Sequence, residues 1–210
     1  MNHLHIKFDK FRESIAVDDP KLPIIERTRK LSEEEFLEIL NDNCKNFYFT
    51  NDQLWRNKKK KYDLELFTPN YRRAKPSAFP KFFDGIEGDS YYPVNRKKSL
   101  IGGTNKDINK RLVSADNYLV IPFDNSEIVF CPTFDLLLMS DNRLKGSELI
   151  NGEEISDKHF VKVNYTEGFE IPRKQLSDIP KHNEKSYEFF ISSPCLMVHE
   201  DKIEWLRNNL

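Results

Sequence analysis

Short apolar segments recur along this chain, and only one strong helix signal stands among them. The clearest strand pattern is 117–122, Asn-Tyr-Leu-Val-Ile-Pro, and 127–131 follows it after an Asp-Asn-Ser turn, which predicts a hairpin or paired strands. The helix is predicted to begin after Ser32, because Ser32 and Glu35 form a capping box, and to end near Cys44. The predicted strands and helices do not alternate along the sequence, as they would in a parallel βαβ fold. We therefore expect an α+β fold with two small, mostly antiparallel sheets around a cleft and a helical N-terminal part.

The length of 210 residues permits one domain, or one domain with a short extension. Apolar residues make up 38% and charged residues 32% of the chain, and sixteen Phe and eight Tyr supply much of the apolar area, which argues against a disordered chain. We expect residues 31–210 to form a single α+β domain. Residues 1–30 are expected to be an N-terminal lead-in that either joins this domain or precedes it.

The cysteines and the apolar runs bear on compartment and cofactors. Cys44, Cys131 and Cys195 are widely separated and form no Cys-x-x-Cys pair, a pattern that suits a reducing cytoplasm and does not fit a zinc ribbon. The five His residues are also scattered, so we expect no metal. No apolar run reaches the roughly 18 to 20 residues that span a bilayer, and the first residues lack the apolar core of a signal peptide. These patterns predict a cytoplasmic protein without a membrane partner and leave its oligomeric state open.

The charge is unevenly distributed although the net charge is −1. Residues 56–111 contain fifteen of the 33 Lys and Arg residues but only six of the 34 Asp and Glu residues. Such a basic segment suits a polyanionic ligand, either a nucleotide pyrophosphate or a nucleic acid. The alternative is a solvated face that the acidic ends of the chain balance in three dimensions. The four-lysine run 58–61 is predicted to be a solvated loop.

Glu188 is one carboxylate in an otherwise apolar strand pattern, 187–191, Tyr-Glu-Phe-Phe-Ile. Glu is depleted in strands, and a carboxylate pushed toward a sheet interior costs several kcal/mol unless a partner compensates it. Far upstream, Arg56 directly follows two large apolar residues. A single acid and a single base at strand starts would suit one cleft if the fold brought them together.

Three short motifs occur in order along the chain. The first is 54–57, Leu-Trp-Arg-Asn, the second lies within 99–104, Ser-Leu-Ile-Gly-Gly-Thr, and the third is 186–194, Ser-Tyr-Glu-Phe-Phe-Ile-Ser-Ser-Pro. This order resembles the mono-ADP-ribosyltransferases of the arginine–serine–glutamate class, including their small bacteriophage members. The resemblance covers about residues 35–200. It implies an ADP-ribosyltransferase-like fold, NAD as cofactor, and a phage factor or toxin that modifies a host protein or nucleic acid in the host cytoplasm.

The resemblance assigns catalytic roles to particular residues. Glu188 would stabilise the oxocarbenium-like cation that forms when nicotinamide leaves ribose. Arg56 would hold pyrophosphate or ribose oxygens with its planar fork. A hydroxyl of the second motif, Ser99 or Thr104, would orient one of these two side chains.

The resemblance also suggests cofactor contacts. Trp55, Tyr118 and Tyr187 are candidates to stack on nicotinamide or adenine, although aromatic residues commonly belong to a core. The pair Gly102 and Gly103 is predicted to end a strand, either as a phosphate cradle or as a plain turn, before a short helix over 104–113.

The motifs depart from the family pattern at several positions. Asn57 stands where the family usually has Gly, and Gly102 and Gly103 stand where Ser and Thr are expected. Ser186 lies two positions before Glu188, where members that modify arginine carry Glu or Gln. These departures leave the acceptor open, and they fit either a divergent enzyme or one that has lost activity.

Two other function classes remain open from the sequence. The first is a catalytically inactive binding module that uses the basic segment to hold a nucleotide, a nucleic acid or a protein partner. The second is a nuclease with a basic groove and His159 or His182 as its base. The first predicts binding that weakens steeply with salt.

Overall fold

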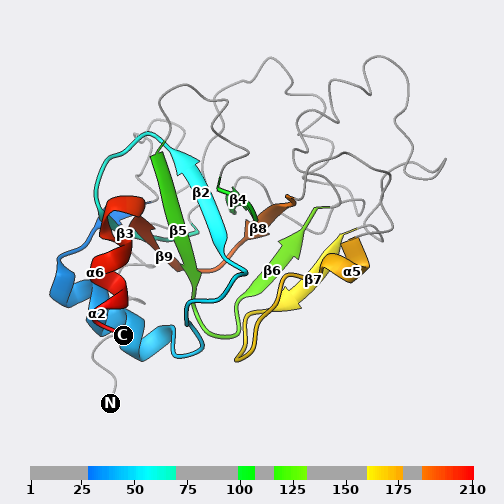
Figure 1. Cartoon of the computed structure of the whole chain (residues 1–210), viewed down its shortest axis with the longest axis horizontal. Helices are drawn as coiled ribbons and strands as arrows, with labels where there is room; N and C mark the ends of the chain where they lie inside the picture. The colour runs from blue at the N-terminus through cyan, green and yellow to red at the C-terminus, as the bar shows by residue number, and fades with distance from the viewer. Residues whose placement is uncertain (1–27, 70–98, 107–115, 132–159, 177–185) are drawn as a thin grey trace, which may run out of the picture.

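The computed structural model describes residues 28–69, 99–106, 116–131, 160–176 and 186–210. The strands in these residues form one nine-stranded sheet in which every neighbouring pair is antiparallel, in the order β1-β3-β9-β5-β2-β4-β8-β6-β7 (Figure 1). Their bounds are β1 (Thr28–Lys30), β2 (Leu54–Lys58), β3 (Leu64–Phe67), β4 (Leu100–Gly103), β5 (Asp116–Pro122), β6 (Glu127–Phe130), β7 (Val161–Asn164), β8 (Glu188–Ile191) and β9 (Cys195–His199).

The expectation of two small sheets with a helical N-terminal part is therefore wrong. Strand β2 pairs with β4 on one edge and with β5 on the other, so it joins the two halves that would otherwise be separate sheets. The first described element is the strand β1, which pairs with β3. The pairing of β2 with β5 covers five residue pairs, whereas the link to β4 is the single pair Trp55 and Gly103.

The helices of the described residues are α2 (Glu33–Asn43), α5 (Arg173–Leu176), the 3₁₀ turn η3 (Glu200–Lys202) and α6 (Ile203–Arg207). The predicted capping box is confirmed. The Glu35 amide donates to Ser32 Oγ at 3.1 Å, and the Ser32 amide donates to Glu35 Oε2 at 3.1 Å. Helix α2 ends at its C-cap Cys44, as predicted. None of the described helices is long and apolar enough to cross a membrane.

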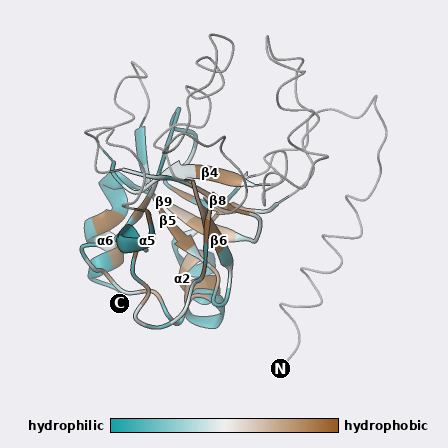
Figure 2. Ribbon diagram, turned by 90° about the vertical axis from the view of Figure 1, so that its right-hand side faces the viewer, coloured by the Kyte–Doolittle hydropathy of each residue, from teal (hydrophilic) through white to brown (hydrophobic). Residues whose placement is uncertain are grey.

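The two faces of the sheet carry separate hydrophobic clusters, as the alternation of side chains along strands requires. One face, here called the helix face, packs against α2 and α6 through residues such as Leu119, Val198 and Leu206. The opposite face, here called the loop face, packs against the segment 165–176 through residues such as Val120 and Met197. Figure 1 shows α2 and α6 together at one end of the sheet and α5 beside β7 at the other. In Figure 2 the hydrophobic colour gathers on strands such as β5, β6 and β8.

The predicted strands 117–122 and 127–131 are present as β5 and β6, but they do not pair with each other. Strand β5 pairs with β2 and β9, whereas β6 pairs with β7 and β8. The connecting turn is held by other segments. The Asp124 carboxylate accepts from the Lys45 and Asn46 amides at 3.0 and 2.9 Å, and the Asn125 amide donates to the Tyr165 carbonyl at 2.8 Å. These contacts separate the two strands at the turn.

Several predicted features lie outside the described residues. They are most of the lead-in 1–30, the helix expected after Asn105 and the histidines His159 and His182. The turn 192–194 joins β8 to β9, and a short terminal helix follows, as predicted. Cys44, Cys131 and Cys195 are buried and form no disulfide, and burial raises the pKa of the Cys44 and Cys195 thiols well above the ordinary range.

Candidate functional site

The three predicted motifs lie on or beside β2, β4 and β8, which are consecutive strands of the sheet although they are far apart in sequence. Trp55 pairs with Gly103, and Gly103 pairs with Glu188. Directly paired residues of antiparallel strands project from the same face of a sheet. Trp55 also packs against the hydrophobic cluster of the helix face. Trp55, Gly103 and Glu188 therefore form one row on that face, here called the Trp55–Glu188 row.

Gly103 lies between Trp55 and Glu188 in this row. It carries no side chain, so only backbone lies between the indole and the carboxylate within the row. Two strand spacings of about 4.8 Å place the Cα atoms of Trp55 and Glu188 about 10 Å apart. Trp55 is half-buried and Glu188 is 8% exposed. An indole can stack on a planar ring, and a carboxylate can accept from a hydroxyl or stabilise a cation. The row thus places a half-buried indole and a buried carboxylate on one face of the sheet.

Thr104 fixes the chain just before Glu188. Its amide donates to the Tyr187 carbonyl at 3.0 Å, and its Oγ1 accepts from the Tyr187 amide at 2.9 Å. The Thr104 hydroxyl also lies 3.5 Å from Ser186 Oγ and donates to it. Together these contacts tie the start of β8 to the end of β4. Thr104 thus holds the backbone at Tyr187, directly before Glu188.

The structure does not bring Arg56 and Glu188 together. Arg56 follows Trp55 directly in β2 and pairs with Tyr118, so its side chain leaves the sheet on the loop face. There its guanidinium donates to the Ile101 carbonyl. The predicted convergence of Arg56, a hydroxyl of the second motif and Glu188 in one cleft therefore fails, because neighbouring residues of a strand project from opposite faces. This separation argues against the active site predicted from Arg56 and Glu188 together.

The predicted aromatic contacts divide between the two faces. Tyr118 is fully buried, and its hydroxyl donates to the Tyr62 carbonyl at 2.7 Å. Burial raises the pKa of Tyr118 to about 12. Tyr187 packs against the cluster of the loop face. Both side chains are part of the interior on that side, so of the three predicted aromatic residues only Trp55 shares a face with Glu188.

Ser99 lies at the far end of β4 from the Trp55–Glu188 row. Its Oγ is 2.7 Å from Ser192 Oγ, and its side chain is 2% exposed. Ser99 is four positions before Gly103, which corresponds to about 13 Å along an extended strand. That distance is too long for the Ser99 hydroxyl to orient Glu188. Of the two hydroxyls predicted for this role, Thr104 is the one that the structure brings to the glutamate strand.

The glycine pair lies inside β4 and does not form a turn. Gly102 and Gly103 both pair with β8, so their backbone belongs to the sheet ladder. A Cβ on Gly102 would overlap the Phe189 ring and the Trp55 carbonyl oxygen. Gly102 is therefore required by the close approach of both the Trp55 carbonyl group and the Phe189 ring. The interpretation as a phosphate cradle does not fit this position.

Sequence reasoning missed a second buried carboxylate, Glu65. It is 0% exposed and lies in the apolar strand 64–67, Leu-Glu-Leu-Phe. Its Oε2 accepts from Lys58 Nζ, while its Oε1 has no hydrogen-bond partner. Burial is the main cause that lowers the pKa of Lys58. The sequence could have indicated Glu65, because a single Glu within an apolar strand segment is the same pattern that identified Glu188.

His199 lies beside Tyr118 on the loop face. The two residues pair across β9 and β5, and their rings meet edge to face at 5.2 Å. His199 is 3% exposed, and its Nδ1 accepts from the Asp201 amide at 3.2 Å. Its Nε2 lies 3.6 Å from Asp116 Oδ1. This arrangement closes the end of β9 and begins η3, so we assign it a structural role. The described residues contain no group of three metal-ligating side chains.

Lys58 and Lys60, in the run 58–61, form ion pairs within the chain. Lys58 pairs with Glu65, and Lys60 lies 2.9 Å from Asp63 and 3.1 Å from Asp201. The prediction of a solvated loop is wrong for Lys58, which lies in β2, whereas Lys59, Lys60 and Lys61 are exposed and follow the strand, as predicted. The carboxylate partners of Lys58 and Lys60 compensate two of the four charges, which weakens the case for a binding module built on this run.

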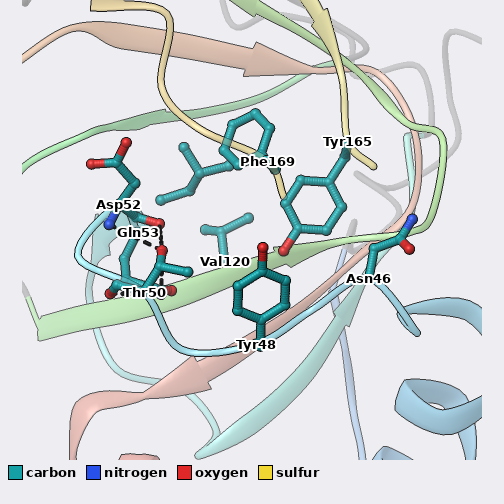
Figure 3. Close-up of a pocket in the computed structure, with 9 residues that line it drawn as sticks. Asn46, Tyr48, Thr50, Asp52, Gln53, Val120, Tyr165 and Phe169 are labelled. Carbon is teal, nitrogen blue, oxygen red and sulfur yellow. Dashed lines mark hydrogen bonds between the residues drawn. The ribbon is translucent and has the colours of Figure 1, made fainter. Parts of the chain in front are cut away.

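A small pocket opens on the loop face between β2, β5 and the segment 165–169. Figure 3 shows the hydroxyl groups of Tyr48 and Tyr165 turned toward each other across it, with Phe169 and Val120 behind. Its volume is about 10 Å³, which is room for about one water molecule. It is therefore too small to hold a nucleotide.

Comparison of the chain with protein-family models, with curated proteins and with solved structures finds no match in any of the three.

Proposed function

We propose that this chain binds NAD and cleaves the bond between nicotinamide and ribose, transferring ADP-ribose to an acceptor. One observation carries the proposal: three motifs from distant parts of the sequence lie on adjacent strands, and two of them place Trp55 and Glu188 in one row on one face. The order of the motifs, which resembles that of the mono-ADP-ribosyltransferases, supports the same chemistry. The site differs from the family pattern because Arg56 lies on the other face.

In the proposed reaction, the bond between the nicotinamide nitrogen and C1′ of ribose breaks, and its electron pair leaves with nicotinamide. The acceptor nucleophile forms a new bond to C1′ and loses its proton to solvent. Glu188 accepts a hydrogen bond from the ribose 2′-hydroxyl and stabilises the positive charge that develops on the sugar. Trp55 stacks against a planar ring of the ligand. Thr104 holds the chain at Tyr187, so that the carboxylate is fixed before the ligand arrives.

The acceptor is proposed to be a host protein or nucleic acid in the cytoplasm. The buried, free cysteines support a reducing compartment. Water is the simplest acceptor, since it would give free ADP-ribose and nicotinamide without an added macromolecule. An assay with water needs no knowledge of the physiological acceptor.

The test combines NAD binding by calorimetry with chromatographic detection of nicotinamide, using the full chain with and without a host lysate. Glu188→Gln is expected to lower turnover about 100-fold or more while the Kd for NAD changes less than about twofold, because the carboxylate acts mainly in the transition state. Glu127→Gln is the matched control, since Glu127 is also the first residue of a strand but is exposed. Absence of NAD binding, or equal turnover in Glu188→Gln and Glu127→Gln, would overturn the proposal.

A further inference from the structure

The proposed ligand carries a pyrophosphate, and this negatively charged group needs a cation on the same face of the sheet as Glu188. Arg56 does not lie on that face, and its guanidinium is bound to the Ile101 carbonyl. A different cation on the helix face is therefore required if the Trp55–Glu188 row binds NAD.

Lys106 meets this requirement. It lies three residues beyond Gly103 and is exposed, and its Nζ is 5.6 Å from the centroid of the Trp55 ring. Asn57, which projects from the same face as Trp55, donates from its side-chain amide to the Lys106 carbonyl at 3.5 Å. The backbone of Lys106 is thus held near β2, and its ammonium lies over the indole.

Within the part of the chain that the structure describes, no carboxylate oxygen lies within 4.0 Å of Lys106 Nζ. By contrast, Lys58, Lys60, Lys162 and Lys202 each have a carboxylate partner there. An ammonium that is exposed and adjacent to an aromatic ring can bind an anionic group.

We propose that Lys106 binds the pyrophosphate of NAD and replaces Arg56 in this role. This inference rests on the proposed function of the Trp55–Glu188 row. The ribose next to nicotinamide would lie toward Glu188, and the phosphates would lie toward Lys106, with the Trp55 indole between them. Lys106 is then a binding residue for the diphosphate and takes no part in breaking the glycosidic bond.

The test measures the Kd for NAD and for nicotinamide riboside, which lacks phosphate, by calorimetry. Lys106→Gln is expected to weaken NAD binding about tenfold, as the loss of one charge-assisted hydrogen bond would, and to leave riboside binding within about twofold. Lys106→Arg is expected to retain most of the NAD affinity. Lys59→Gln is the matched control, because Lys59 is also an exposed lysine, and it should not change either Kd.

The outcomes separate this inference from the function on which it rests. If the unmodified chain does not bind NAD, both fail. If it binds NAD, but Arg56→Gln weakens the binding tenfold and Lys106→Gln does not, only the assignment of Lys106 is wrong. Equal weakening of NAD and of the riboside by Lys106→Gln would mean that Lys106 acts through packing on Trp55, and this result also overturns the assignment.

Discussion

The ion pair between Lys58 and Glu65 makes a strong prediction about stability, because its two members differ in exposure. The Glu65 side chain is 0% exposed, whereas that of Lys58 is 20% exposed, and Lys58 Nζ also lies 4.6 Å from the centroid of the Tyr118 ring. Removal of the lysine leaves the Glu65 carboxylate without a compensating charge in the interior. Removal of the carboxylate leaves a flexible ammonium that can turn toward water.

The magnitudes follow from this asymmetry. Lys58→Met is expected to lower the free energy of unfolding by about 3 to 5 kcal/mol, the usual cost of an uncompensated buried charge. Glu65→Leu is expected to cost less, about 1 to 2 kcal/mol, because Lys58 keeps a route to solvent. The double variant is expected to lie within about 1 kcal/mol of the unmodified chain, since an apolar pair of similar volume avoids the desolvation of both charges. The coupling free energy between the two sites is then about 3 kcal/mol or more.

Urea unfolding followed by the fluorescence of the two tryptophans measures all four stabilities by linear extrapolation. Lys162→Met serves as the control, because Lys162 and its partner Glu127 are about half-exposed and such a pair contributes less than about 1 kcal/mol. A cost below 1 kcal/mol for Lys58→Met would refute the reasoning, since Glu65 would then not depend on Lys58 for compensation.

Two further predictions concern the loop face. The raised pKa of Tyr118, about 12, exceeds the ordinary value of 10.0 because the buried side chain resists ionisation. The unionised Tyr118 therefore makes its full contribution to the free energy of unfolding below pH 10. As the pH rises from 10 toward 12, the free energy of unfolding should fall by up to about 2 to 3 kcal/mol. Unfolding measurements across this pH range should show a smaller fall for Tyr118→Phe than for the unmodified chain. Gly102→Ala is expected to destabilise the chain by about 1 to 3 kcal/mol through overlap with the Trp55 carbonyl oxygen and the Phe189 ring. Combination with Phe189→Leu should cost less than the two single changes together, and simple additivity in thermal or urea unfolding would contradict the close approach.

Local patterns predicted much of the secondary structure because their causes are local. Ser32 and Glu35 form their capping box within one turn of helix, so no distant contact is needed to foresee it. The strand 117–122 was predictable from its apolar, β-branched composition in the same way. The pairing of strands was not, since the partners of β5 and β6 depend on contacts of the turn 124–126 with segments such as 45–46. A turn signal indicates where the chain reverses and does not fix which strands become neighbours.

The division of the predicted site between two faces shows why its geometry was harder to foresee than its residues. Placement of Arg56 and Glu188 on one face or on two depends on the register of two successive pairings, β2 with β4 and β4 with β8. A slip of one residue in either pairing would exchange the faces. The sequence supplied residue types suited to NAD chemistry, but no motif in it encodes that register. The glycine at position 103 lies between Trp55 and Glu188 in the observed register, so the indole replaces the guanidinium as the neighbour of the carboxylate in the row. For this reason the proposal rests on Trp55 and Glu188, and it assigns the positive charge that binds the diphosphate to Lys106.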